Sequence, residues 1–284
     1  MKRSIMALTI ATTLGLISAA RADATKRNDS ASEKLGIKLS LQCYTFRALT
    51  FFETVDKAAA LGIRYLEIYP GQKLKPGSDA KIAVPMPDDM KAEVMKKLAD
   101  AGGLKLVAFG VNEVPKDEKG ARRQFEAAKA LGIEVLVTET VPNDVHDKLC
   151  QETGLRYALH NHPKTWPPDK VLEASKGHSN KIGSCSDVGH WQRADLIPLE
   201  QFKKLEGRVQ HSHFKDLNEF GGKAHDVPWG TGRADSKALL AELKRQGYKG
   251  YLSIEYEYGS VKDLDGTVPK CVAFFDATMD ELAK

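Results

Sequence analysis

The segment ALGIRYLEI, residues 60–68, joins the end of a helix to the start of a strand through a single glycine. The same joint recurs as ALGIEVLVT at 130–138 and as RQGYKGYLSI at 245–254. Glycine is favoured at such joints because the residue after a helix commonly adopts the left-handed conformation. The repeated joint therefore predicts a chain in which helices alternate with short parallel strands.

Eight short apolar runs alternate with amphipathic stretches along the chain. The predicted strands are 38–44, 65–69, 104–110, 134–139, 155–160, 181–186, 208–213 and 251–255. The predicted helices are 51–61, 88–101, 118–131, 143–153, 168–175, 198–205, 235–246 and 267–282. Eight strand–helix units predict an α/β protein of the (β/α)8 TIM barrel class, with residues 35–284 as one domain. The alternative, a doubly wound open sheet, is disfavoured because no glycine-rich dinucleotide loop follows the first strand.

The composition is that of an ordinary globular protein. Of the 284 residues, 42% are hydrophobic and 28% are charged, which disfavours collagen, coiled coils and long disorder. The balance of 42 basic and 38 acidic residues does not suggest a nucleic-acid-binding surface. The four cysteines share no short spacing, so we expect buried free thiols rather than a disulfide scaffold.

Residues 1–24 have the features of a secretory signal peptide. Lys2 and Arg3 precede an apolar run, and Ala22-Asp23-Ala24 fits the cleavage rule for small residues. An uncleaved N-terminal anchor is the alternative, and either one predicts a periplasmic or secreted domain. We expect residues 25–34 to be a flexible lead-in because they are polar. No later apolar run is long enough to span a membrane.

Histidine and acidic residues, together with one lysine, gather at the ends of five consecutive predicted strands, where barrels of this class place their active sites. These residues are Glu139, His160, His162, Asp187, His190, His211, His213, Lys215, Glu255 and Glu257. Residues two apart in a strand share a face, so one member of each histidine pair is expected to point into the barrel mouth. Imidazole and carboxylate groups together suit one divalent metal ion, with Mn, Co, Zn and Mg as candidates. A lone histidine in a strand is more often a core residue, but five such ends in register predict a metal site.

Five phrases of the chain resemble the xylose isomerase-like barrel superfamily, also described as sugar phosphate isomerase/epimerase. They are HNHP at 160–163, SDVGHW at 186–191, RVQHSHFKD at 208–216, VPWGTG at 227–232 and YLSIEYE at 251–257. Relatives in this superfamily include ketose 3-epimerases, inosose dehydratases, 3-keto-glycoside lyases and endonuclease IV. The resemblance extends over residues 36–284.

The resemblance implies a set of metal ligands. Epimerase relatives hold their metal with Glu, Asp, His and Glu from the last four strands, which carries over to Asp187, His213 and Glu255 on the last three. His160 replaces the fifth-strand glutamate, which in those relatives also helps to move the proton. Glu139, one strand earlier, is the alternative source of that carboxylate. His190 and Lys215 match positions that face the substrate.

The expected chemistry is removal of a proton next to a substrate carbonyl, with a metal-stabilised enediolate as the intermediate. The predicted catalytic residues are Glu139, His162, Lys215 and Glu255. The predicted substrate-binding residues are Glu67, His190, Trp191 and Lys215. Glu67 is expected either to bind a sugar hydroxyl or to support the barrel rim, and the tryptophan either to stack on a sugar ring or to cap the core.

The sequence therefore predicts a secreted sugar isomerase or epimerase that acts on a non-phosphorylated keto-sugar, because sugar phosphates are cytoplasmic. Residues 230–232 are the one candidate phosphate cradle, and a tight turn before a helix is the alternative. A 3-keto-glycoside lyase or hydratase and a non-catalytic sugar-binding barrel are the alternative functions, while near-neutral charge disfavours a nuclease. We expect a small-molecule sugar as partner, no nucleic acid and no membrane span after signal cleavage. The sequence leaves open whether the chain forms a homo-oligomer.

Overall fold

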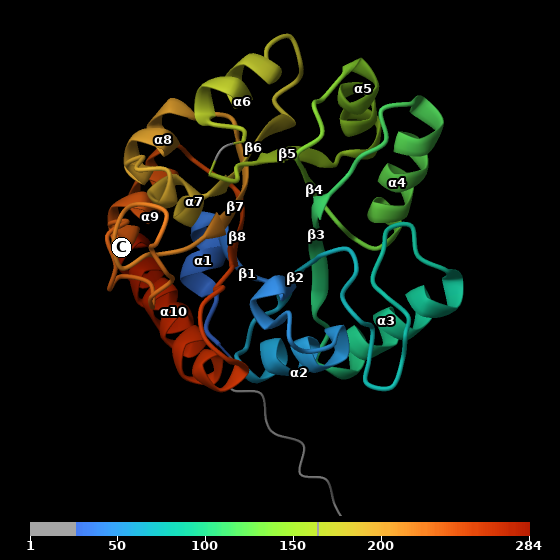
Figure 1. Cartoon of the computed structure of the whole chain (residues 1–284), viewed down its shortest axis with the longest axis horizontal. Helices are drawn as coiled ribbons and strands as arrows, with labels where there is room; N and C mark the ends of the chain where they lie inside the picture. Colours follow the sequence, from blue (N-terminus) through green and yellow to red (C-terminus); the bar gives the residue numbers. More distant parts are fainter. Residues whose placement is uncertain (1–26, 164) are drawn as a thin grey trace, which may run out of the picture.

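In a computed structural model, the described residues, 27–163 and 165–284, form a closed barrel of parallel strands surrounded by helices (Figure 1). The strands are β1 (Ile37–Gln42), β2 (Tyr65–Ile68), β3 (Lys105–Asn112), β4 (Val135–Thr138), β5 (Arg156–His160), β6 (Ile182–Asp187), β7 (Val209–Phe214) and β8 (Gly250–Ile254). They pair in chain order, and β1 pairs with β8 to close the ring. This confirms the predicted α/β fold, a (β/α)8 TIM barrel.

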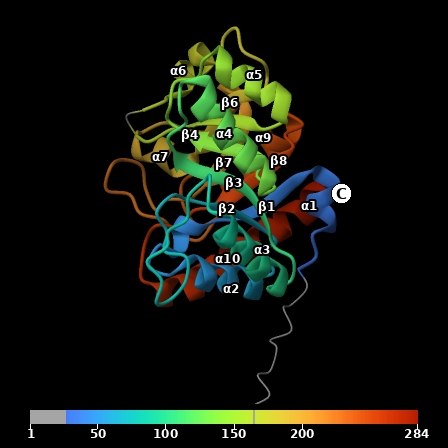
Figure 2. The same cartoon turned by 90° about the vertical axis from the view of Figure 1, so that its right-hand side faces the viewer.

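Helices surround the strands in Figure 1, and the side view in Figure 2 shows the strands in the middle of the molecule with helices above and below them. They are α1 (Ser30–Leu35), α2 (Phe51–Ala60), α3 (Asp88–Asp100), α4 (Glu118–Ala130), α5 (Asp144–Thr153), α6 (Pro168–Ala174), α7 (Val188–Arg193), α8 (Pro198–Lys204), α9 (Ser236–Arg245) and α10 (Val261–Leu282). The strands are buried along nearly their whole length, since helices cover their outer face and side chains fill the interior. The core therefore lies inside the ring and between the ring and the helices.

The glycine joints have the predicted geometry. Gly62, Gly132 and Gly247 follow α2, α4 and α9, with φ values of 68°, 81° and 67°. These angles lie in the left-handed region, where a side chain would be strained. Each glycine thus ends a helix and turns the chain toward the next strand.

Helix α1 and the residues just before it correct the prediction of a flexible lead-in for residues 27–34, while residues 25 and 26 lie outside the described part of the chain. Asp29 is buried and accepts hydrogen bonds from Arg64, and Arg27 is paired with Asp276 of α10 at 2.9 Å. Gly36 ends the helix in the left-handed conformation. These ion pairs hold polar residues against the barrel, which composition alone does not show.

Residues 1–24, where a signal peptide is predicted, lie outside the described part of the chain. Within that part, no helix is both long and apolar enough to cross a membrane. The four cysteines are free and buried, as predicted.

Helix α7 was not predicted from the sequence. It begins directly after β6, because Asp187 ends the strand and caps the helix by accepting the backbone N–H of His190 at 2.7 Å. Helix α10 begins six residues before its predicted start, at a capping box formed by Ser260 and Asp263.

Candidate functional site

Four polar side chains meet at the carboxyl-terminal mouth of the barrel, from the ends of β5, β6, β7 and β8. Each offers one nitrogen or oxygen atom, and these atoms lie within 4.8 Å of one another. We refer to this group as the ligand cluster, which consists of His160, Asp187, His213 and Glu255. All four side chains are buried. Two imidazoles and two carboxylates are groups that commonly bind divalent metal ions.

Strand register brings the members of the ligand cluster together. Asp187 and His213 are partners in the pairing of β6 with β7, so their side chains point to the same side of the sheet. His213 also pairs with Ser253 of β8, two residues before Glu255. Because side chains alternate along a strand, Glu255 shares the face of Ser253 and reaches the same point in the mouth.

The carboxylate of Asp187 is oriented by the helix that follows it. Its Oδ1 atom accepts the N–H of His190 at the first turn of α7. Its Oδ2 atom faces the ligand cluster and lies 3.5 Å from His160 Nε2 and 3.9 Å from His213 Nδ1. The cap thus uses Oδ1 and leaves Oδ2, which accepts a hydrogen bond from Lys215 at 2.8 Å, directed into the ligand cluster.

The ligand cluster fits a bound cation because it contains buried nitrogen atoms without hydrogen bonds. Among the described residues, both ring nitrogens of His160 have no hydrogen-bond partner. His213 Nδ1 lies 3.0 Å from Glu255 Oε2 but not in hydrogen-bond geometry, so it also has no partner. Buried polar atoms in proteins nearly always bond to something, and a bound ion is one explanation of an exception. The pair of imidazoles favours Zn or Co over Mg, which prefers oxygen ligands.

Lys215 lies beside the ligand cluster with a fully buried side chain. Its ammonium group lies 2.8 Å from Asp187 Oδ2, 2.6 Å from Glu255 Oε2 and 2.8 Å from Glu257 Oε2. Gly189 makes room for this side chain, since a Cβ there would lie 2.7 Å from Lys215 Cδ. Three carboxylates around one ammonium leave surplus negative charge, which favours a cation in the same place.

Burial and charge oppose each other at these buried groups. Burial lowers the pKa of Lys215, but the surrounding carboxylates outweigh it and hold this pKa well above its usual value. Burial raises the pKa of Asp187, but positive neighbours, including Lys215, hold it well below its usual value. The pKa of His190 falls to about 2, chiefly through burial. The lysine and aspartate are therefore charged at neutral pH, and His190 is neutral.

Glu67, on β2, lies deeper in the barrel and supports His213. Its carboxylate is 2.8 Å from His213 Nε2 through Oε1, and it is 2.7 Å from both His211 Nε2 and Ser253 Oγ through Oε2. The contact assigns the Nε2 proton of His213 to the bond with Glu67, so Nδ1 is the nitrogen available to a metal. Burial raises the pKa of Glu67, but the two histidines outweigh it and lower this pKa far below its usual value.

A second pair of side chains lies at the rim of the mouth, beside His160. Glu139 Oε1 bonds to His162 Nδ1 and accepts the hydroxyl of Thr165 at 2.9 Å. Burial raises the pKa of Glu139, but these hydrogen bonds outweigh it and lower the pKa. His162 is 47% exposed, and its Nε2 atom carries the free lone pair in this arrangement. We refer to Glu139 and His162 as the rim pair.

A pocket of about 340 Å³ opens above the ligand cluster, and we refer to it as the central pocket. It is lined by Gln42, Tyr44, Tyr69, Pro70, Gly110, Val111, His160, His162, His190, Glu255 and Glu257. Its volume is at the lower end of the range for small-molecule sites. The rim pair and the ligand cluster therefore face one pocket of a size suited to a small substrate.

A family model described as a xylose isomerase-like TIM barrel matches residues 55–276. The chain belongs to this family. The resemblance carried by the five sequence phrases is thereby confirmed. The family includes sugar epimerases and inosose dehydratases, which are enzymes.

Three relatives illustrate the similarity. An uncharacterised protein from Parabacteroides distasonis ATCC 8503 is 31% identical, with a TM-score of 0.67 over 84% of this chain and 98% of its own. A solved IolI protein with a bound zinc atom is 19% identical, with a TM-score of 0.55 over 87% of this chain and 98% of its own, which shows the fold alone. An inosose dehydratase from Lacticaseibacillus casei is 25% identical over 46% of this chain and 50% of its own length. The chain thus matches about half the length of that curated relative.

In this protein, three of the residues predicted to bind substrate are absent from the lining of the central pocket. Glu67 is fully buried beneath His213 and supports it from below, which is closer to the structural alternative than to a sugar contact. Trp191 is buried against Phe202, with ring centroids 5.2 Å apart, and caps the core. Lys215 is buried among carboxylates and is not part of the lining of the pocket. His190 and His162 do line the pocket.

The sequence offered His160 and Glu139 as alternatives for the fourth metal ligand, and the structure places them in different groups. His160 belongs to the ligand cluster with the three carried-over residues. Glu139 lies with His160 and His162 in a neighbouring group and bonds to the latter.

Two aromatic side chains in the central pocket were not predicted. Tyr44 and Tyr69 follow β1 and β2, and their rings meet edge to face at 5.2 Å. The signal available in the sequence was their position as the last residues of two predicted strands, since tyrosine carries no metal-ligand pattern. Glu257 was noted at a strand end but given no role, and its contact with Lys215 places it at the pocket wall.

The candidate phosphate cradle at residues 230–232 is already filled by a side chain. Asp216 accepts the backbone N–H groups of Gly230, Gly232 and Ala234 at 2.9, 3.0 and 3.0 Å. A Cβ at Gly232 would lie 2.2 Å from Asp216 Oδ1, which explains the second glycine. The donors that could have held a phosphate are thus used to fix the loop, as the tight-turn alternative predicts.

Proposed function

We propose that this protein is a divalent-metal-dependent enzyme that enolises a non-phosphorylated keto-sugar or keto-polyol. The observation that carries the proposal is the ligand cluster, with its unpartnered imidazole nitrogens, beneath a pocket that also contains the rim pair. His160, Asp187, His213 and Glu255 would hold the ion. When bound, a divalent cation supplies Lewis-acid polarisation of a carbonyl and stabilises the enediolate that follows proton loss.

The rim pair is the proposed proton-transfer group. Glu139 fixes the tautomer and the ring orientation of His162, as a carboxylate does for a catalytic histidine. His162 Nε2 then takes the proton from the carbon beside the carbonyl and returns it. This role compensates for the replacement of a glutamate by His160 at the fifth strand. Neutral His190, which lines the same pocket, donates a hydrogen bond to a substrate oxygen.

Two observations support an unphosphorylated substrate. The loop that barrels of this class often use for phosphate is occupied by Asp216. The central pocket contains no arginine or lysine in its lining among the described residues. A phosphate group would therefore lack both the backbone donors and the cation that usually bind it.

The fate of the enediolate defines two candidate reactions. Return of the proton to the opposite face or the neighbouring carbon gives epimerisation or isomerisation, which is the principal proposal. Loss of a group from the β-carbon gives elimination, as in a lyase or dehydratase, and the likeness to an inosose dehydratase favours this second candidate. A sugar-binding barrel without turnover is the third candidate, because the fifth-strand glutamate is replaced.

We also propose that the protein is exported, on the basis of the signal-peptide pattern in residues 1–24. The N-terminal residue of protein recovered from the periplasm or medium tests this. An N-terminus close to residue 25 is expected, and an intact Met1 in a cytoplasmic fraction would contradict export.

The test of the enzymatic proposal is deuterium uptake from solvent. Purified protein is loaded with Zn, Co or Mn and incubated in D2O with 3-keto-glucose and with free ketoses, and NMR locates the deuterium. We expect uptake at the carbon next to the carbonyl in metal-loaded protein and none in chelator-treated protein. Unchanged substrates in all metal-loaded samples would refute enolisation and leave the binding protein as the remaining candidate.

A further inference from the structure

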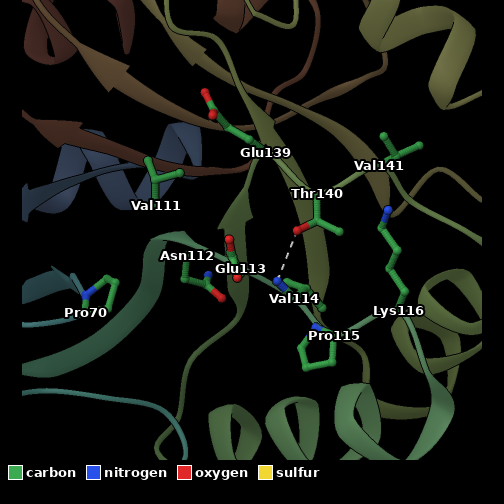
Figure 3. A pocket seen from close by; sticks show the side chains of 10 residues that line it. All are labelled: Pro70, Val111, Asn112, Glu113, Val114, Pro115, Lys116, Glu139, Thr140 and Val141. Carbon is green, nitrogen blue, oxygen red and sulfur yellow. Dashed lines mark hydrogen bonds between the residues drawn. The ribbon is translucent and has the colours of Figure 1, made fainter.

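A second cavity, of about 870 Å³, lies beside the central pocket at the ends of β3 and β4 (Figure 3). We refer to it as the lateral cavity. It is lined by Pro70, Val111, Asn112, Glu113, Val114, Pro115, Lys116, Glu139, Thr140 and Val141. None of these residues belongs to the ligand cluster, and among them only Glu139 belongs to the rim pair, so the proposed enolisation leaves most of this space unassigned.

The lateral cavity and the central pocket are neighbours along one opening. Pro70 and Val111 line both of them. Glu139 lines the lateral cavity, while its bonded partner His162 lines the central pocket. A ligand with one part above the ligand cluster would therefore extend past the rim pair into the lateral cavity.

The walls of the lateral cavity are held in place by hydrogen bonds. Val114 N donates to Thr140 Oγ1 at 3.2 Å and ties the segment after β3 to the segment after β4, as Figure 3 shows. Tyr157 Oη donates to Thr140 O at 2.8 Å, and Trp166 Nε1 donates to Glu139 O at 3.0 Å. Because the backbone is fixed from behind, the shape of the cavity is formed before any ligand arrives.

The side chains in the lateral cavity are of mixed type and nearly balanced charge. Within residues 27–163 and 165–284, the charged groups of Glu113 and Lys116 make no hydrogen bond or ion pair, so they are available to a ligand. Val111, Val141 and two prolines supply apolar surface between them. Polar groups that alternate with small apolar surfaces match a sugar ring, which presents both hydroxyls and C–H faces. The single lysine, opposed by carboxylates, gives no net attraction for an anion.

We propose that the lateral cavity is a binding subsite for a second, uncharged sugar residue attached to the reacting keto-sugar. The substrate is then a keto-disaccharide or a larger keto-glycoside rather than a free monosaccharide. This inference rests on the proposed function for the identity of the first sugar. The second residue contributes binding energy away from the reacting carbon and lowers KM.

The test compares two substrates and two variants of the metal-loaded enzyme. The substrates are 3-keto-glucose and the disaccharide in which 3-keto-glucose is β-linked to glucose, and deuterium uptake measures turnover of each. Val141→Trp fills the lateral cavity from its exposed rim, where Val141 is 54% exposed and a larger side chain does not disturb the core. Ile197→Trp, at another exposed apolar position that is 59% exposed and outside both cavities, is the matched control.

We expect kcat/KM to be about tenfold higher for the disaccharide, mainly through KM, and Val141→Trp to remove most of that advantage while Ile197→Trp keeps it. Equal kcat/KM values for the two sugars would refute the subsite proposal. It would also be refuted if Val141→Trp lowered kcat/KM equally for both sugars.

Binding separates this inference from the proposed function. Amide NMR shifts of Lys116 and Val141 are followed during titration with unoxidised cellobiose and with glucose. If no keto-sugar takes up deuterium but cellobiose shifts these amides more strongly than glucose, the subsite stands and enolisation fails. If deuterium enters the keto-sugars but cellobiose leaves these amides unmoved, enolisation stands and the subsite fails.

Discussion

The two sides of the barrel mouth differ in how their polar groups are used. On the side of β5 to β8, the ionisable groups around the ligand cluster are buried and contact one another. On the side of β3 and β4, Glu113 and Lys116 are exposed and unpaired within the described residues. Buried groups fixed by contacts with one another can position an ion or a proton. Exposed groups without such contacts can instead form hydrogen bonds with a ligand. The first side is suited to chemistry and the second to selection of the substrate.

The largest expected effect comes from Glu255→Gln, because Glu255 contacts both a member of the ligand cluster and the buried lysine. Its Oε2 atom lies 3.0 Å from His213 Nδ1 and 2.6 Å from Lys215 Nζ. A neutral amide removes one anionic ligand of the metal, and it also removes one of the negative charges that balance the buried Lys215 ammonium. We expect loss of bound metal and turnover that falls to the level of chelator-treated protein, measured by metal analysis and deuterium exchange.

The exposed substitution Glu219→Gln is the matched control and should retain both metal and turnover. Retention of metal and activity by Glu255→Gln would show that the ligand cluster is not the metal site, and the contrast between the two sides would then be lost.

The next largest effect is expected from His162→Asn, at the boundary between the two sides. The substitution removes the proposed proton-transfer group but no member of the ligand cluster. We expect kcat to fall by about 10²- to 10⁴-fold, the range for loss of a general base, with metal content unchanged. His178→Asn, outside both cavities, serves as control. A normal kcat would assign proton transfer to another residue.

A smaller effect is expected from Glu67→Gln, which weakens support from beneath the ligand cluster. Glu67 holds His213 through Nε2, and such supporting carboxylates typically contribute about 10- to 100-fold to metal affinity. Competition with a chelator measures the affinity, and the ¹⁵N shifts of His213 report which nitrogen carries the proton. If metal affinity and tautomer are both the same as in the parent protein, Glu67 is only a core residue.

The most gradual of the expected effects is the pH dependence of metal affinity. Burial lowers the pKa of His213, but its neighbours Cys185, Glu255 and Glu67 outweigh it and raise the pKa well above the usual value. Below that raised pKa, the cation must displace a proton from His213, so metal affinity should increase with pH. We expect a change of about tenfold per pH unit for one displaced proton, measured by chelator competition at pH 6 and pH 8. Equal affinity at the two pH values would mean that His213 binds the metal without losing a proton.

Much of the candidate site could be predicted because its residues follow strands. The barrel places all strand ends at one mouth, so His160, Asp187, His213 and Glu255 could be expected to converge once eight units were recognised. The alternation of side chains also predicts that His211 and His213 share a face, and both contact Glu67. The sequence did not show that Glu67, Trp191 and Lys215 are buried rather than part of the pocket lining, because a strand end indicates proximity to the mouth but not depth.

The sequence by itself determined the alternation of strands and helices, the glycine joints and the polar character of the strand ends, because these depend on residues within a few positions of one another. Only the tertiary structure decided which groups are buried against each other. Glu67 and His213, for example, are 146 positions apart in the chain and 2.8 Å apart in space. The lateral cavity is likewise formed by segments from β2, β3 and β4. Local periodicity fixes the direction of a side chain, whereas its partners depend on strand register and on the closure of the ring, which no short segment encodes.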